Sequence, residues 1–315
     1  MWNWASWFWV ETDSERGPKP VHGLRYLQMP DQLVECVPNF SEGRDPAVVD
    51  SIVEAIASGG AKILDRTSDH DHHRSVVTFA APPEGVGEAA FRGVRRAIES
   101  IDLRRHWGVH PRIGAADVVP FVPVKGVALE DCARIARETG QRIWEELRVP
   151  VYLYEAAALR PECRNLADIR RGRVPLPDFG DAAHPSAGAV VVGARKFLIA
   201  FNVNLQTGDL EVARRVARAV RHSSGGLPHV KAMGVLLASR NQAQVSMNLT
   251  DFEATPMHVA LEAVRVQAAR YGVTVAGTEI IGLVPEKALE MTAAWYLQVS
   301  NFVPGVILEH RLENR

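Results

Sequence analysis

The chain has 315 residues, of which 47% are hydrophobic and 23% charged, a composition typical of globular proteins that excludes disordered and collagen-like classes. Its 36 basic and 37 acidic residues leave a formal net charge of -1, which argues against nucleic acid or an anionic membrane as a bulk partner, because both need a strong positive field. The three cysteines form no C-x-x-C pair and no zinc-ligand spacing, which favours reduced thiols in a cytoplasmic protein.

The first 30 residues differ from the rest of the chain. They open with the aromatic run MWNWASWFWV and then turn polar. This run lacks the basic start of a signal peptide, and neither it nor any later stretch is long enough to span a bilayer. We expect residues 1–30 to be an extension outside the folded domains, with Met29 as a plausible natural start. The other interpretation is a terminal segment that docks on a partner surface.

Hydrophobic spacing predicts regular elements from Leu33 onward. Asp45-Pro46 is typical of a helix start, and apolar residues follow it at helical spacing until Gly59-Gly60 ends the pattern. In this half of the chain we expect strands at 33–37, 61–64, 75–79, 118–124 and 151–154, and helices at 46–58, 86–101 and 129–147.

A segment rich in proline and glycine follows Pro161 and interrupts this pattern. Beyond it we expect strands at 197–202, 230–237, 244–249 and 273–283, and helices at 209–220 and 255–271. The order strand-helix-strand-strand-helix-strand therefore occurs twice, which is typical of ferredoxin-like units. We predict an α+β fold of two ferredoxin-like subdomains, residues 31–192 and 193–315, with packed sheets and helices on the outside.

The loop HWGVHPRIGAAD carries the side chains best suited to proton transfer. Histidine has an unperturbed pKa of roughly 6.5, so His110 can give or take a proton near neutral pH. Arg112 could clamp a carboxylate in a bidentate manner, and Asp117 follows at the start of a strand. An ordinary polar surface loop is the alternative, and the residue types alone favour neither interpretation.

A second polar loop, from Asp65 to Arg74, contains Asp69, Asp71 and three histidines. Imidazole and carboxylate are good ligands for zinc or manganese. Adjacent residues of one loop rarely all face one ion, however, and no second ligand set is evident. We therefore predict no metal, and interpret the loop as a solvated turn or as a segment that places one or two groups on a substrate.

Two further segments could contact a small ligand. The small residues of DFGDAAHPSAG let a flat molecule approach the backbone, although an inter-lobe linker is the simpler interpretation of this segment by itself. Asn39, Ser41 and Glu42, at the end of the first strand, either bind a polar ligand or cap the next helix. The sequence has no phosphate-binding loop and no nucleophile elbow. It also has no aromatic stripe on a basic face, which argues against nucleic-acid binding.

Six separated segments together resemble the glutamate formimidoyltransferase family, which in animals forms the first part of the bifunctional formimidoyltransferase-cyclodeaminase. The resemblance extends from about Leu33 to Leu289 and is dense. The segments are VECVPNFSEGR, HPRIGAADVVPFVPV, VPVYLYEAA, GARKFLIAFNVNL, QVSMNLTDFEATPMH and IIGLVPEKALE.

The resemblance implies two subdomains with folate bound between them, and the transfer of a formimidoyl group from N-formimidoylglutamate to N5 of the co-substrate tetrahydrofolate, in histidine breakdown. It implies that His110 is the catalytic residue and that no metal or redox cofactor is required. The segment matched to folate contact is Gly180, Asp181, Ala182, Ala183, His184, Pro185, Ser186, Ala187 and Gly188. Candidates for binding a substrate or orienting the imidazole are Asn39, Asp69, Asp71, Arg74, Arg112 and Asp117.

Two residues depart from the family pattern. His73 stands where the family usually has asparagine, and Asp181 stands where proline commonly follows the glycine. An acidic side chain at residue 181 would affect folate affinity or the preferred polyglutamate length.

Two alternatives to the transferase therefore remain open. One is a related folate enzyme that uses a formyl donor, either 5-formyltetrahydrofolate or N-formylglutamate. The other is a non-catalytic folate-binding protein. The resemblance also implies a homodimer and, because the chain ends at Arg315, a separate cyclodeaminase.

Overall fold

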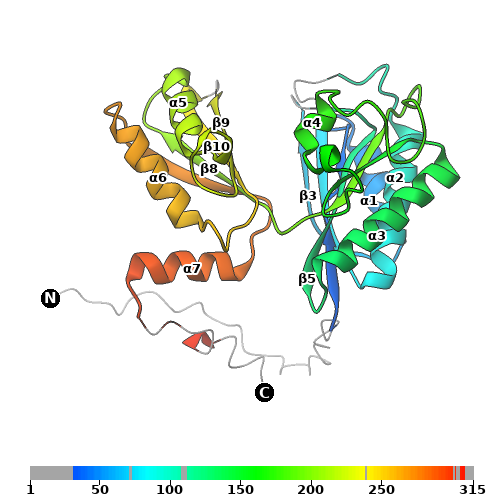
Figure 1. Ribbon diagram of the computed structural model, residues 1–315, viewed down its shortest axis with the longest axis horizontal. Helices are drawn as coiled ribbons and strands as arrows, with labels where there is room; N and C mark the ends of the chain where they lie inside the picture. Colours follow the sequence, from blue (N-terminus) through cyan, green and yellow to red (C-terminus); the bar gives the residue numbers. More distant parts are fainter. Residues whose placement is uncertain are drawn as a thin grey trace, which may run out of the picture. The chain divides into compact units, whose positions relative to one another are not determined.

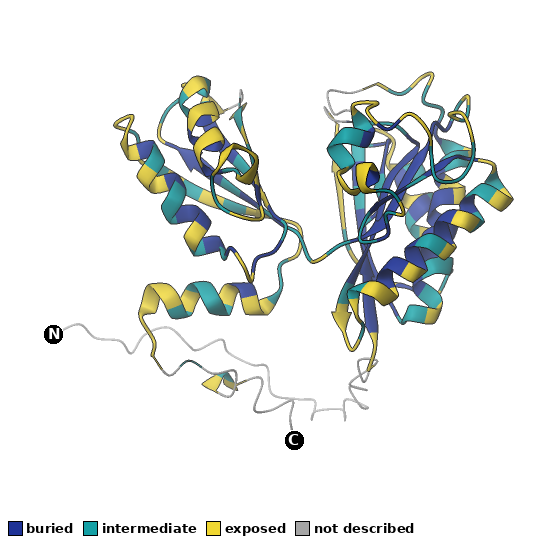
Figure 2. Ribbon diagram, in the orientation of Figure 1, coloured by how far each residue is buried: buried dark blue, intermediate teal, exposed yellow. Residues whose placement is uncertain are grey.

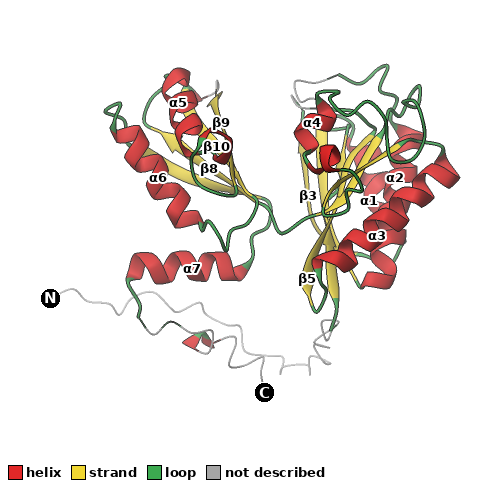
Figure 3. Cartoon of the chain, viewed as in Figure 1, coloured by secondary structure: helices red, strands yellow, loops and turns green. Residues whose placement is uncertain are grey.

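The computed structural model describes residues 31–70, 73–107, 112–237, 240–300, 302 and 306–308. The extension predicted over residues 1–30 lies outside this part of the chain. The described residues form two β-sheets, each with its own helices and its own hydrophobic core (Figures 1 and 3). The predicted α+β class with two subdomains is therefore confirmed.

The first sheet has seven strands and three long helices. β4 pairs with β3 on one side and with β1 and β2 on the other, and β5 pairs with β1 and β2. This is the ferredoxin-like order, and β7 and β6 extend it with parallel pairing beyond β5. The strands are β1 (Leu33–Cys36), β2 (Asn39–Phe40), β3 (Lys62–Asp69), β4 (Arg74–Ala81), β5 (Ala116–Lys125), β6 (Val151–Glu155) and β7 (Val190–Ala194), and the helices are α1 (Pro46–Ala57), α2 (Pro83–Ser100), α3 (Leu129–Arg142) and the short α4 (Leu166–Arg170).

Helix α1 shows why the local sequence fixes this architecture. The Asp45 carboxylate caps its first turn, Pro46 occupies a position where no hydrogen-bonding N–H is needed, and Ile52 and Ile56 are fully buried. In Figure 2 the central strands of this sheet and the inner faces of its helices are buried, whereas the edge strand β3 is largely exposed.

Three details of the first sheet differ from the prediction. β3 extends to Asp69 in spite of its polar sequence, because it is an edge strand that pairs only with β4. Helix α3 ends at Arg142, and the predicted remainder, Ile143–Leu147, is a π-helical turn. The segment after Pro161 contains α4, where a loop was expected, and β7 follows this segment at Val190–Ala194, where no strand was predicted.

The second sheet has four antiparallel strands in the order β11-β8-β10-β9, which is the ferredoxin-like order without additions. Helices α5 and α6 pack against it and share its core. An additional helix, α7, was not predicted; it buries only Ala288. The elements are β8 (Ile199–Leu205), α5 (Leu210–Val220), β9 (Val230–Leu237), β10 (Gln242–Leu249), α6 (Met257–Ala269), β11 (Val275–Ile281) and α7 (Glu286–Leu297). None of the described helices has the length and hydropathy needed to cross a membrane.

Glu35, in the middle of β1, is a buried carboxyl group with 5% exposure. Burial raises its pKa from 4.5 to about 7, and the positive charge of Arg195 offsets only part of that effect. The unfolded chain releases this proton near pH 4.5, whereas the folded chain holds it until about pH 7. The free energy of unfolding therefore falls as the pH rises between these values, by a total on the order of 3 kcal/mol.

We expect Glu35→Gln, which keeps the shape of the side chain but cannot ionise, to be about 2–3 kcal/mol more stable than the wild type at about pH 8. Near pH 4.5 the two proteins should differ little, because the carboxyl is then neutral in the folded state. Urea unfolding at the two pH values measures the effect, with Glu54→Gln on the exposed side of α1 as the control. An equal difference at both pH values would contradict the expectation.

Candidate functional site

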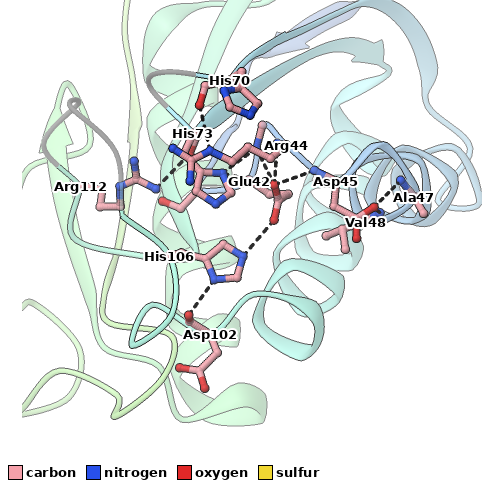
Figure 4. Close-up of polar contacts among 12 residues, drawn as sticks. Glu42, Arg44, Asp45, Ala47, Val48, His70, His73, Asp102, His106 and Arg112 are labelled. Atoms are coloured by element: carbon pink, nitrogen blue, oxygen red, sulfur yellow. Dashed lines mark hydrogen bonds and ion pairs between the residues drawn. The ribbon is translucent and has the colours of Figure 1, made fainter.

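The loop that leads into α1 is organised around one carboxylate (Figure 4). Oε1 of Glu42 accepts the backbone N–H groups of Gly43, Arg44 and Asp45 at 2.8, 2.7 and 3.0 Å. Burial raises the pKa of Glu42, but the N–H groups of Asp45 and Arg44, together with His106 and His73, outweigh burial and bring the pKa below its usual value. Glu42 is therefore a buried carboxylate that stays ionised at neutral pH.

Two histidines lie against this carboxylate. Nε2 of His106 is 2.9 Å from Oε2 of Glu42, and its Nδ1 is 2.7 Å from the backbone carbonyl of Asp102. Nδ1 of His73 is 3.2 Å from Oε1 of Glu42 and accepts the N–H of Gly43 at 3.1 Å. The two rings are stacked with their centroids 4.9 Å apart. We call Glu42, His73 and His106 the carboxylate–histidine cluster.

His73 adopts an unusual backbone conformation. It lies in the turn before β4 with φ 48°, in the left-handed region, and its side chain is nearly buried. Asparagine tolerates this region better than most residues, which gives a physical reason for the asparagine that the resembled family usually carries here. Burial lowers the pKa of His73, so its ring is neutral at neutral pH.

A second buried network connects three strands with helix α4. Oδ2 of Asp117 pairs with Nη1 of Arg74 at 2.7 Å and with Nη2 of Arg170 at 2.6 Å, and its Oδ1 accepts the N–H of Ile113 at 2.8 Å. Nε and Nη2 of Arg74 donate to Oδ1 of Asn39 at 3.1 and 2.9 Å. Burial raises the pKa of Asp117, but the charges of Arg74 and Arg170 outweigh burial and hold the pKa below its usual range.

The two networks fix the chain on both sides of residues 108–111. These four residues include His110 and lie outside the described part of the structure. His106, before them, is held by the contacts with Glu42 and Asp102. After them, Nη1 of Arg112 donates to the backbone carbonyl of His73 at 3.0 Å, and Ile113 donates to Asp117.

The segment 180–188 is joined to this region by main-chain hydrogen bonds. Gly114 and Gly188 form an antiparallel bridge. The N–H groups of Leu103, Ala115 and Ala189 donate to the carbonyls of Ser186, Ala187 and Ile113 at 2.8, 2.9 and 2.8 Å. The chain on either side of residues 108–111 and the segment 180–188 are therefore parts of one hydrogen-bonded unit.

The outer part of the same segment is open to solvent. Asp181, Ala182 and Ala183 are exposed, whereas Ala187 and Gly188 are buried. The loop is closed at its base by two backbone bonds between residues 184 and 188, at 2.7 and 2.9 Å. A ligand can therefore reach the exposed residues 181–183, which we call the crest, while residues 184 and 188 stay bonded at the base of the loop.

The structure brings most of the predicted polar residues together. Asn39, Arg74 and Asp117 form one network, and Arg112 contacts the carboxylate–histidine cluster. Asp69 lies at the exposed end of β3, opposite Arg74 in the strand register. Asp71, like His110, falls outside the described residues.

Four participants in these networks were not assigned a role from the sequence. Glu42 was interpreted either as a residue that binds a polar ligand or as a helix cap; the cap of α1 is Asp45, and the oxygens of Glu42 face the N–H groups that precede the helix and the ring of His106. His73, His106 and Arg170 had no expected partner. Of these residues, only His106 had a sequence signal that could have identified it, because it lies four residues before His110 in the same motif.

The fold and these motifs together define a formiminotransferase domain. Residues 33–195 match the model of its N-terminal subdomain, and residues 200–311 match the model of the formiminotransferase domain. The chain belongs to this family.

Curated relatives agree with this assignment. The chain is 48% identical over 295 residues to glutamate formimidoyltransferase of Thermoplasma acidophilum, covering 89% of this chain and 97% of the relative. It is 45% identical to glutamate formimidoyltransferase of Streptococcus pyogenes, covering 86% and 95%. It is also 45% identical to formimidoyltransferase-cyclodeaminase of Rattus norvegicus; this match covers 84% of this chain and 52% of the relative.

Proposed function

We propose that the protein is a glutamate formimidoyltransferase. It transfers the formimidoyl group of N-formimidoyl-L-glutamate to N5 of tetrahydrofolate and gives 5-formimidoyltetrahydrofolate and L-glutamate. The observation that carries this proposal is the 48% identity to a glutamate formimidoyltransferase over 97% of that relative's length. Tetrahydrofolate, in mono- or polyglutamyl form, is a co-substrate of this reaction.

The segment 180–188 contacts the folate in this proposal. Its exposed crest offers small side chains that leave the backbone accessible, and its base is bonded to the residues that follow His110. A flat ligand bound at the crest would therefore contact a segment whose base is hydrogen-bonded to the chain on both sides of the loop that carries His110.

His110 moves the protons of the reaction. N5 of tetrahydrofolate attacks the imine carbon and forms a tetrahedral adduct. The imidazole of His110 takes the proton from N5 and delivers it to the glutamate nitrogen, and the bond between that nitrogen and the carbon then breaks. A single histidine that acts first as base and then as acid contributes roughly 10²–10⁴-fold to such a step. Holding both substrates in position supplies much of the remaining acceleration.

The neighbouring polar residues hold the loop and the substrates in place. Asn39 and Asp117 both pair with Arg74, so the three residues act as a rigid support for the segment after His110. Arg112, bonded to the carbonyl of His73, is the best placed to meet a carboxylate of glutamate. Asp69 and Asp71 complete the set of candidates for orienting a substrate.

The wider context follows the sequence predictions. We propose a cytoplasmic protein that acts as a homodimer and hands its folate product to a separate cyclodeaminase, with no nucleic-acid or membrane partner. The reaction as written requires no metal.

The transferase proposal is tested by mixing purified protein with tetrahydrofolate and N-formimidoylglutamate and measuring 5-formimidoyltetrahydrofolate. We expect multiple turnovers with this donor and far slower reaction with 5-formyltetrahydrofolate or N-formylglutamate at equal concentration. Preferred turnover of a formyl donor would overturn the assignment in favour of a related folate enzyme. Folate binding without any turnover would indicate a binding protein.

A further inference from the structure

The carboxylate–histidine cluster has a ligand geometry that the transferase chemistry does not use. One oxygen of Glu42, one ring nitrogen of His73 and one of His106 lie within 4.8 Å of one another. Two ligands at about 2.0–2.1 Å from a tetrahedral zinc ion are themselves roughly 3.3 Å apart. Nδ1 of His73 is 3.2 Å from Oε1 of Glu42, and Nε2 of His106 is 2.9 Å from the other oxygen, Oε2. We propose that these three residues bind one divalent transition-metal ion of the zinc class.

The hydrogen bonds of His106 call for a cation at this place. Its Nδ1 faces a carbonyl oxygen and its Nε2 faces a carboxylate oxygen, and both oxygens can only accept. A neutral imidazole carries one ring hydrogen and satisfies only one of them. With that hydrogen on Nδ1, donating to the Asp102 carbonyl, the lone pair of Nε2 faces the carboxylate oxygen, and a metal ion bound by both atoms would satisfy this contact. The bond from Nδ1 to the Asp102 carbonyl is the outer-shell contact that metal-binding histidines typically make.

His73 is prepared to act as a ligand. The N–H of Gly43 points at Nδ1, so this nitrogen carries a lone pair. The same N–H also lies 2.8 Å from Oε1 of Glu42. When a metal ion takes the lone pair of His73, Gly43 keeps a partner and no buried donor is left unsatisfied.

The donor set selects the kind of ion. Two imidazoles and one carboxylate suit zinc, iron, cobalt or nickel, whereas magnesium and calcium prefer oxygen ligands. Three protein ligands leave a fourth position for water, as in zinc sites formed by two histidines and one glutamate. The cluster therefore fits an accessible metal ion more closely than a closed structural site.

Positive charges near the carboxylate–histidine cluster lower its affinity for a metal ion but do not prevent the ion from binding. The positive charges of Arg44 and Arg112 both act on His73. Nε of Arg44 donates to the carbonyl of His70 at 3.0 Å, and Nη1 of Arg112 donates to that of His73 at 3.0 Å, so each side chain has a backbone partner in the hairpin.

A metal ion at this place would tie three segments together. Glu42 precedes α1, His73 belongs to the turn between β3 and β4, and His106 follows α2 (Figure 4). One of the three ligands, His73, stands where the resembled family usually has asparagine. His73→Asn therefore removes one ligand and still suits the left-handed backbone.

The test uses the full chain without a histidine tag, stripped with a chelator and then titrated with Zn²⁺ against a chromophoric competitor. Co²⁺ absorption reports the ligand geometry in parallel, and neither readout involves folate or turnover. The variants are His73→Asn and His106→Gln, with His222→Asn, an exposed histidine of the second subdomain, as the matched control. Far-UV circular dichroism and melting temperature verify that each variant is folded.

We expect one equivalent of Zn²⁺ in the wild type and in the control, and a loss of affinity of at least about tenfold in His73→Asn and in His106→Gln. Zn²⁺ should raise the melting temperature of the wild type but not that of His73→Asn, because only a native site that binds the ion stabilises the fold. Absence of stoichiometric binding, or equal binding by the wild type and folded His73→Asn, would overturn the proposal.

Discussion

Replacing Asp117 with asparagine is expected to lower the free energy of unfolding by about 3–5 kcal/mol. The Asp117 side chain is fully buried, and the two arginines that pair with it are only 11% and 18% exposed. Asparagine has nearly the same shape but no charge, so it leaves Arg74 and Arg170 buried beside each other without a counter-ion. Breaking a buried pair on one side is costly for this reason.

Asp168→Asn is the matched control for this effect. Asp168 also lies near two arginines, Arg171 and Arg173, but both of these are more than 60% exposed. Pairs of this kind are worth roughly 0–1 kcal/mol because water screens them. Urea unfolding followed by circular dichroism compares the two variants. A loss below about 1 kcal/mol in Asp117→Asn would mean that the network is not the buried charge pair derived above.

His110→Ala is expected to lower kcat by roughly 10²–10⁴-fold and to leave KM for tetrahydrofolate nearly unchanged. The reason is that alanine can neither take the proton from N5 nor return it to the departing nitrogen, whereas the proposed folate contacts lie in the segment 180–188. Steady-state kinetics with both substrates varied separates the two parameters.

The same kinetics on His222→Ala, an exposed histidine of the second subdomain, provide the comparison. The proposed role of His110 would be wrong if its variant kept kcat within about tenfold of the wild type, since general acid–base catalysis contributes more than that. A parallel rise in KM for tetrahydrofolate would instead assign His110 to folate binding.

The sequence predicted the elements that have a clear hydrophobic period. Helix α1 has both a cap and a spacing signal, and the second sheet follows the expected strand order closely. β7 was missed because its run VVVGA lies directly after a loop rich in glycine and proline, and its parallel pairing with β5 depends on tertiary contacts. Helix α7 was missed because it buries one residue and so has little amphipathic pattern.

The candidate site was predicted only in part, because its partners are far apart along the chain. Glu42 and His106 are separated by 64 positions, and Asp117 and Arg170 by 53. Spacing within one motif cannot show such contacts. The sequence supplied Asn39, Arg74 and Asp117 as candidates, while the way they pair, and the three-residue cluster of Glu42, His73 and His106, came from the fold.

The bridge between Gly114 and Gly188 limits how this domain can diversify. A Cβ at Gly114 would lie 1.9 Å from the carbonyl oxygen of Ala189, and one at Gly188 would lie 2.1 Å from that of Ile113. Neither position accepts a side chain without moving backbone, so the offset between the two segments is set by main-chain atoms alone. With the proposed folate contact at this segment, changes in ligand preference would fall on the exposed residues 181–183, where residue 181 already differs from the family pattern. Such substitutions would leave the main-chain alignment at the base of the segment unchanged.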